Sequence, residues 1–104
     1  MNLQQAKVAS VSELRREGWS EAAIYTRSLW CKYNLTETEV KYGLDRLQGN
    51  EETCIDVARI ILPKDKLRLL LLDGKKETKE LRAEFNLVPV DEFDAKYDAL
   101  LAAL

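Results

Sequence analysis

The chain contains no histidine and only two cysteines among its 104 residues. Histidine is the commonest general base in enzymes and the commonest side-chain ligand of zinc and iron. Cys31 and Cys54 are far apart in the sequence and form no Cys-x-x-Cys pair, so a Cys/His zinc site is excluded. We therefore expect no metal site.

The short motifs of common enzyme classes are also missing. The sequence has no Gly-x-Ser-x-Gly elbow, no phosphate-binding loop, no dinucleotide-binding Gly-x-Gly-x-x-Gly and no EF-hand calcium loop. Acidic residues are plentiful, but their spacing singles out no pair that would act as general acid and base. We expect no catalytic residue and no cofactor, and therefore a protein that is not an enzyme.

Neither sign of charge dominates, because 16 basic residues face 18 acidic ones and the net charge is −2. Such a balance gives no general attraction to nucleic acid or to anionic lipid. Acidic residues are in excess over residues 35–62 and 89–104. We interpret these segments as solvated faces; the alternative is a single acidic patch that meets a basic partner.

Long apolar runs are absent, and the leucines at 69–72 form a stretch far too short to cross a bilayer. The first residues lack the charged segment followed by an apolar run that is typical of a secretory signal. We expect no association with membranes, a cytoplasmic location, and two reduced cysteines buried as small hydrophobic side chains.

Signals for helix ends follow one another closely between residues 10 and 39. Ser10 with Glu13 predicts a capping box, in which the hydroxyl accepts a hydrogen bond from a backbone N–H of the first turn. Gly18 followed by Trp19 predicts a Schellman stop, and Ser20 is placed to begin the next helix. The connection between these two helices is therefore very short.

The same arrangement recurs one helix later. Asn34 is suited to end the second helix, and Thr36 with Glu39 predicts another capping box. Connections this short are typical of compact bundles. The sequence predicts an all-α fold: a compact bundle of five or six short helices with tight capped turns, forming a single helical domain over residues 1–104.

Residues 55–72 allow two interpretations. Residues 55–62 and 67–72 can form two short helices, or two strands of a hairpin that would make the fold α+β and winged-helix-like. The β-branched residues in the first segment favour strands. The connecting residues 63–66 contain no glycine or asparagine, however, and strict alternation of apolar and polar residues fails. We favour helices.

Two helices carry apolar surface that suits either the core or a partner. Residues 20–34 are apolar around nearly half of the expected helix. Near the C-terminus, apolar residues repeat at spacings of 3, 4, 3 and 4 through Val90, Phe93, Tyr97, Leu100 and Leu104. We interpret both stripes as core; the alternative for the C-terminal one is a dimer seam or a partner groove.

These features favour a small non-catalytic protein–protein interaction module, which would be an adaptor, an inhibitor or an accessory factor. The partner would be a protein of unknown identity, with a homodimer through the C-terminal helix as an alternative. Tyr42 points away from the apolar stripe of its helix, which makes it the best candidate for an exposed aromatic. The candidate partner-binding residues are Tyr25, Tyr42, Asp94, Tyr97, Asp98 and Leu104.

The competing hypothesis is a helix-turn-helix DNA-binding transcriptional regulator. Short helices with tight turns suit it, and the stretch from Leu14 to Ile24 loosely resembles the turn of such motifs. Glutamates at the start of the third helix would repel phosphate, which counts against that helix as the reading element. The candidate phosphate contacts are then Arg15, Arg16, Arg27 and Lys32.

Overall fold

The protein is all-α in the computed structural model, which describes residues 2–49, 51, 54–74 and 90–103, with side chains for all of these except 90–93. The described residues contain no strand, and they form helices α1 (Leu3–Val8), α2 (Val11–Arg16), α3 (Glu21–Tyr33), α4 (Glu37–Arg46), α5 (Cys54–Ile61), α6 (Lys64–Asp73) and α8 (Val90–Ala103). The predicted fold class is confirmed. The described residues contain seven helices, whereas five or six were expected for the chain. One reason is that residues 3–8 form a separate helix. The highly charged sequence over residues 75–85 predicts a further helix, which lies outside the described residues.

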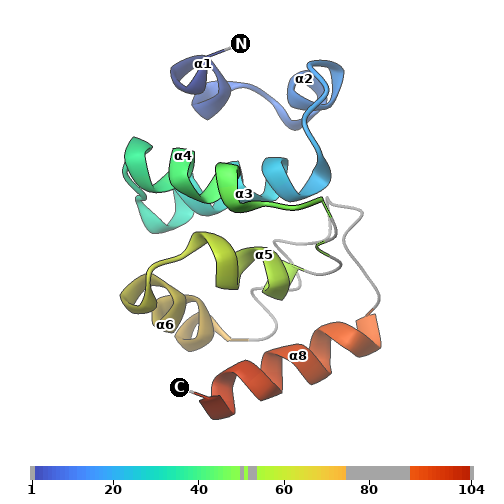
Figure 1. The fold of residues 1–104 in the computed structure, drawn as a ribbon, viewed down its shortest axis with the longest axis vertical. Helices are drawn as coiled ribbons and strands as arrows, with labels where there is room; N and C mark the ends of the chain where they lie inside the picture. Colours follow the sequence, from blue (N-terminus) through green and yellow to red (C-terminus); the bar gives the residue numbers. More distant parts are fainter. Residues whose placement is uncertain (1, 50, 52–53, 75–89, 104) are drawn as a thin grey trace.

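The helices are stacked in layers along the longest axis of the molecule (Figure 1). Helices α1 and α2 form one end, α3 and α4 the next layer, and α5 and α6 the layer after that, with α8 at the far end. Helix α3 packs against α1, α2, α4 and α5, and α8 packs against α5. The central position of α3 explains why apolar residues cover so much of its circumference.

The junction between α2 and α3 forms as the sequence predicts. Gly18 has a φ of 89°, which is in the left-handed region where a side chain would be strained. The N–H of Gly18 donates to the carbonyl of Arg15, and the N–H of Trp19 donates to the carbonyl of Leu14, both at 3.1 Å. This is the Schellman pattern. The Ser20 hydroxyl then accepts a bond from the N–H of the third residue of α3 at 3.2 Å.

The junction between α3 and α4 repeats this design with asparagine in the place of glycine. Asn34 is left-handed at a φ of 51°, and the N–H of Leu35 donates to the carbonyl of Trp30. The Thr36 hydroxyl accepts from the N–H of Glu39 at 3.1 Å, and the Glu39 carboxylate accepts from the N–H of Thr36 at 2.9 Å. Both halves of this predicted capping box are therefore present.

The first predicted capping box forms only in part. The Ser10 hydroxyl accepts from the N–H of Glu13 at 3.1 Å, but within the described residues the glutamate makes no return bond to the Ser10 N–H. A complete box that the sequence analysis missed begins α1, where Asn2 and Gln5 each accept a bond from the other's backbone N–H. Helix α1 therefore has a defined start despite its six residues.

Residues 55–72 form two helices, so the hairpin alternative is wrong. Pro63 lies between α5 and α6, where a residue without an N–H is tolerated at the start of a helix. The buried residues of α5 recur at helical spacing, among them Cys54, Val57, Ala58 and Ile61. Burial of this face against α3 and α4 outweighs the preference of its β-branched residues for a strand.

The apolar stripe of α8 docks on the chain's own core. Tyr97 and Leu100 are buried, and the Tyr97 hydroxyl donates to the backbone carbonyl of Leu71 at 2.8 Å. The interpretation of this stripe as core is confirmed for these two residues. Leu104 and the side chains of Val90 and Phe93 lie outside the described residues.

Helices α4 and α5 pack closely against each other at Gly43, which is buried. A Cβ atom placed on Gly43 would lie 2.5 Å from the Cδ1 atom of Ile61. Carbon atoms pack at about 3.5–4.0 Å, so any residue larger than glycine would require the end of the Ile61 side chain to shift. The glycine in the interior of α4 therefore has a packing role.

Candidate functional site

The most exposed described aromatic residue, Tyr42, lies beside a shallow groove. The side chain of Tyr42 is 64% exposed. The groove has a volume of about 220 Å³, and we call it the Tyr42 groove. Its lining comes from α4, from the end of α5 and from the connection to α6, and consists of Glu39, Tyr42, Arg46, Ile60, Ile61, Leu62 and Pro63.

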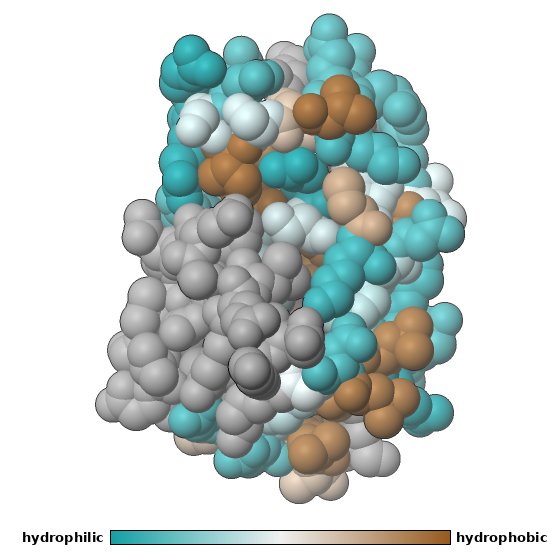
Figure 2. Space-filling model, turned by 180° about the vertical axis from the view of Figure 1, so that it is seen from behind, coloured by the Kyte–Doolittle hydropathy of each residue, from teal (hydrophilic) through white to brown (hydrophobic). Residues whose placement is uncertain are grey.

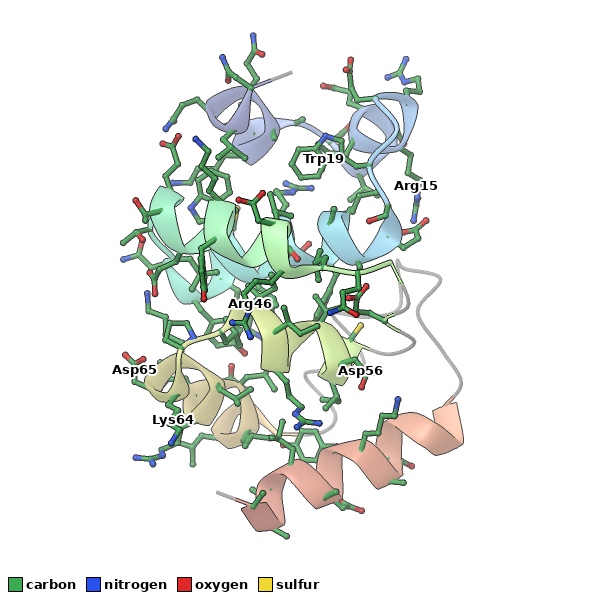
Figure 3. All side chains as sticks on the ribbon, viewed as in Figure 1. Arg15, Trp19, Arg46, Asp56, Lys64 and Asp65 are labelled. Carbon is green, nitrogen blue, oxygen red and sulfur yellow. The ribbon has the colours of Figure 1, made fainter. Side chains whose placement is uncertain are left out.

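Arg46 holds a positive charge at this groove. Its guanidinium lies 5.3 Å from the centre of the Tyr42 ring, which is a cation–π distance. One terminal nitrogen donates to the carbonyl of Ile60 at 3.3 Å, and Figure 3 shows the side chain in the space between α4 and α5. No carboxylate of the described residues forms an ion pair with Arg46.

The acidic residue of the groove, Glu39, is already engaged. Its carboxylate accepts from the N–H of Thr36 and lies 3.4 Å from the Nζ atom of Lys66. The bond from the Thr36 N–H is the main cause that lowers the pKa of Glu39, and the hydrogen bonds from the Thr36 hydroxyl and Lys66 add to it. The charge of Glu39 is therefore neutralised locally, and Arg46 is the unpaired charge of the groove.

Two of the predicted partner-binding tyrosines are core residues. Tyr25 is completely buried, so its assignment to a partner surface is corrected: the packing of α3 between its neighbours covers the ring. Burial raises the pKa of Tyr25 well above its ordinary value, and the nearby Cys54 thiol and Tyr33 hydroxyl add to this effect. Tyr97 is 4% exposed, so it too stabilises the fold from within.

The acidic candidates of α8 lie apart from the Tyr42 groove. Asp98 is exposed and Asp94 is partly buried. Helix α8 packs against α5 at one end of the stack, whereas Tyr42 is carried by α4 in another layer (Figure 1). Among the described residues, the predicted partner-binding side chains thus do not come together into one surface.

The four candidate nucleic-acid contacts do not form one positive patch. The Arg15 guanidinium makes two bonds to the Glu21 carboxylate, at 2.9 and 3.2 Å. Lys32 lies 3.7 Å from Asp73, near the opposite end of α3. Helix α3 itself packs against α1, α2, α4 and α5, so these neighbours cover much of the surface that a recognition helix would lay in a DNA groove.

The two remaining candidates differ in exposure. Arg16 is exposed on α2. Arg27 is only partly exposed, and its Nε atom is buried without a hydrogen-bond partner. This nitrogen is not accessible to a phosphate at the surface of the protein, and the assignment of Arg27 as a phosphate contact stays a prediction for the rest of its guanidinium.

The sequence analysis missed a larger groove that we call the Trp19 groove. It has a volume of about 440 Å³ and is lined by Trp19, Ser20, Ala23, Leu44, Leu47, Gln48, Gly49 and Glu51. Figure 3 shows Trp19 between the layer of α1 and α2 and the layer of α3 and α4. The spacing of Trp19 and Ile24 on either side of Ser20 is typical of a hydrophobic staple, which predicts contacts of Trp19 within the chain. It gives no sign that part of the ring stays accessible.

Exposed leucines form a second feature that the sequence analysis missed. Leu69 and Leu72 of α6 are 50% and 76% exposed, and Leu101 of α8 is 52% exposed. Figure 2 shows hydrophobic surface gathered at the lower right, over the end of the molecule where α6 and the C-terminal end of α8 lie. No groove accompanies these leucines among the described pockets.

Neither cysteine forms a disulfide. Cys54 is buried as predicted, but the prediction of burial is wrong for Cys31, which is exposed on α3 with its Sγ atom 3.8 Å from the carbonyl of Lys7. Within the described part of the chain, no group of three or more acidic or cysteine side chains could hold a metal ion. Likewise, none of the described helices has the length and apolar character needed to cross a membrane.

Comparisons of the chain with protein-family models, with curated proteins and with solved structures found no match. The assignment of a function therefore depends on the surfaces of this molecule alone.

Proposed function

We propose that this protein acts by binding another protein through the Tyr42 groove, as an adaptor, an inhibitor or an accessory factor, and that it is not an enzyme. The observation that carries the proposal is the exposure of Tyr42 beside an unpaired Arg46 and an apolar groove. Tyrosine and arginine are the residue types enriched in the energetic centres of protein interfaces.

The groove also indicates the chemistry of the partner. Ile60, Leu62 and Pro63 supply apolar surface for an aliphatic or aromatic side chain. Arg46 has no carboxylate partner among the described residues, so an aspartate or glutamate next to that side chain would complete a charge-assisted hydrogen bond. A partner segment that combines an apolar residue with an acidic one fits both halves of the surface.

The compartment is part of the same proposal. Cys31 is a free and exposed thiol, and such thiols persist in reducing compartments. We place the complex in the cytoplasm. A second copy of this chain is also a candidate partner, although the buried Tyr97 and Leu100 leave less of the C-terminal stripe for a dimer seam than the sequence alone indicates.

Affinity capture with matched variants tests the proposal. Tagged protein is incubated with lysate of the native host, with and without nuclease, and bound proteins are quantified by mass spectrometry. We expect one stoichiometric partner that survives nuclease, is lost with Tyr42→Ala and is weakened by Arg46→Gln. Removal of a tyrosine from an interface centre costs about 2 kcal/mol or more, which is roughly a 30-fold loss of affinity.

Two controls make this loss specific to the groove. Tyr42→Phe keeps the ring and should retain the partner. Leu72→Ala removes a more exposed apolar side chain on α6 and should also retain it. If the partner binds Tyr42→Ala and the wild type with equal affinity, the Tyr42 groove is not the contact surface. Recovery of nucleic acid alone would favour the helix-turn-helix hypothesis instead.

A further inference from the structure

The Trp19 groove combines an apolar surface with a single charged side chain. Its apolar surface comes from Trp19, Ala23, Leu44 and Leu47, each of which is only partly buried. Glu51 is the one charged residue among the described residues that line the groove, so the lining includes a negative charge and no positive one. The volume of about 440 Å³ lies within the range of ordinary ligand pockets.

The Glu51 carboxylate is held in place by the backbone of the groove itself. One oxygen accepts a hydrogen bond from the N–H of Gln48 at 2.7 Å, and the other accepts from the N–H of Gly49 at 3.0 Å. Gln48 and Gly49 both line the groove, so these bonds fix the carboxylate beside the lining. A carboxylate offers about four acceptor sites, so each oxygen keeps the capacity for one more donor.

The charge of Glu51 has no counterion within the described part of the chain. No described lysine or arginine forms an ion pair with it, and the two backbone donors carry no net charge. Glu51 is only partly exposed, so water screens its charge less than that of a fully exposed carboxylate. A cation delivered from outside would therefore gain a charge-assisted hydrogen bond at this position.

The residues beside Glu51 indicate which cation suits the groove. A guanidinium group stacks on aromatic rings and is more weakly hydrated than an ammonium group, so it matches the tryptophan that lines the same groove. The aliphatic stem of an arginine also covers apolar surface, such as that of Leu44 and Leu47. A small inorganic cation would leave this surface uncovered. The groove is open to solvent, as a side chain presented by another protein requires.

We propose that the Trp19 groove binds an arginine side chain on a segment of another protein. The stem packs against Leu44 and Leu47, the guanidinium lies against the Trp19 ring, and its N–H groups donate to the Glu51 carboxylate. Successive residues of a helix are about 100° apart, so Leu44 and Leu47 lie on the far side of α4 from Tyr42. The inference rests on the proposed protein-binding function for the class of its occupant, but it concerns a separate surface.

A titration of the wild-type protein followed by NMR tests the groove without any variant. The probe is a blocked peptide with one arginine in a neutral serine–alanine background, and matched peptides carry citrulline, lysine or leucine in its place. Citrulline keeps the planar head of arginine without its charge. We expect the arginine peptide to shift the Trp19 indole N–H signal and to bind about 5- to 30-fold more tightly than the citrulline peptide. Trp30 is 3% exposed and lies outside the groove lining, so its indole signal should not move.

Variants identify the carboxylate that pairs with the arginine. Glu51→Gln keeps an oxygen that accepts a backbone bond, and it should abolish the preference for arginine over citrulline while the citrulline peptide binds as before. Glu13→Gln makes the same change of charge on exposed α2 and should leave the preference intact. Thermal unfolding of each variant shows whether it is folded. If Glu51→Gln is not folded, the comparison of the two peptides on the wild type decides the proposal by itself.

Three results would overturn the inference: equal affinity for the arginine and citrulline peptides, no shift of the Trp19 signal, or a preference that survives Glu51→Gln. Tighter binding of the lysine or leucine peptide than of the arginine peptide would also reject arginine as the occupant. Loss of a captured partner with Tyr42→Ala concerns the other groove and is independent of all these outcomes, so this inference can fail while the proposed function stands, and the reverse.

Discussion

Replacement of Gly43 by alanine tests whether α4 and α5 pack as closely as the structure describes. In the interior of a helix, alanine is favoured over glycine by about 1 kcal/mol, so an exposed Gly43 would gain stability from the change. Gly43 is buried, however, and the new Cβ atom would lie 2.5 Å from the Cδ1 atom of Ile61. The two effects have opposite signs, and their magnitudes decide the outcome.

The steric effect is expected to win. Extra atoms forced into a packed core cost about 1–3 kcal/mol, and Ile61 is only 5% exposed, so its side chain cannot swing freely into solvent. Subtracting the gain in helix propensity leaves Gly43→Ala destabilised by about 0–2 kcal/mol. The other close atoms, the Cα and Cγ2 of Ile61, lie at 3.4 and 3.5 Å, so Cδ1 alone accounts for most of the conflict.

Ile61→Val removes Cδ1 and therefore serves as the partner in a double-mutant cycle. Alone it should cost about 0.5–1.5 kcal/mol. In its presence Gly43→Ala should stabilise the protein by up to about 1 kcal/mol, because the propensity gain is then unopposed. Urea unfolding of the four proteins, followed by circular dichroism, should give a coupling energy of about 1–3 kcal/mol.

Ile55→Val provides the matched control, because it deletes the same methyl group from another buried position of α5. The effect of Gly43→Ala should be the same in that background as in the wild type. If Gly43→Ala stabilises the wild type by about 1 kcal/mol and shows no coupling to Ile61, the close approach of α4 to α5 at Gly43 is wrong.

Changes at four further positions probe the helix ends and the docking of α8. Thr36→Ala removes one half of a complete capping box and should cost about 1 kcal/mol in urea unfolding. The wild type should have a larger free energy of unfolding than Glu39→Gln, and this difference should reach its full size above the ordinary glutamate pKa of 4.5. It should vanish as the pH falls through the lowered pKa of folded Glu39, as measured by unfolding over a pH series. Asn34→Ala should cost about 1 kcal/mol more than Asn34→Gly in thermal unfolding, because residue 34 is left-handed. Tyr97→Phe removes the bond to the Leu71 carbonyl and should cost about 1 kcal/mol.

The ends of the helices could be predicted from the sequence because their bonds join residues that are three to five positions apart. The bonds from Trp19 to Leu14 and from Leu35 to Trp30 depend only on a left-handed residue between them, which Gly18 or Asn34 supplies. The missed capping box at the start of α1 belongs to the same class. Its signal, an asparagine followed three residues later by glutamine, was present in the sequence.

Exposure could not be predicted in the same way, because it depends on which faces the other helices cover. Tyr25 and Cys31 both belong to α3, yet the tyrosine is completely buried and the cysteine is exposed. Both residues sit in an apolar stretch but on different sides of the helix, and periodicity places Cys31 beside Ile24, which is itself completely buried. Only the arrangement of α1, α2, α4 and α5 around α3 separates them. The same limit explains why the accessible part of Trp19 was missed.

Gly43 lies on α4 between the residues that line the Tyr42 groove and those that line the Trp19 groove. On the circumference of α4, Gly43 lies between the side that carries Tyr42 and Arg46 and the side that carries Leu44 and Leu47, because successive residues are about 100° apart. The line of closest contact with α5 therefore runs between the two grooves. Any residue larger than glycine would have to displace the end of the Ile61 side chain, which also lines the Tyr42 groove. The packing role of Gly43 thus bears on the shape of the Tyr42 groove, although Gly43 is not one of the residues that line it.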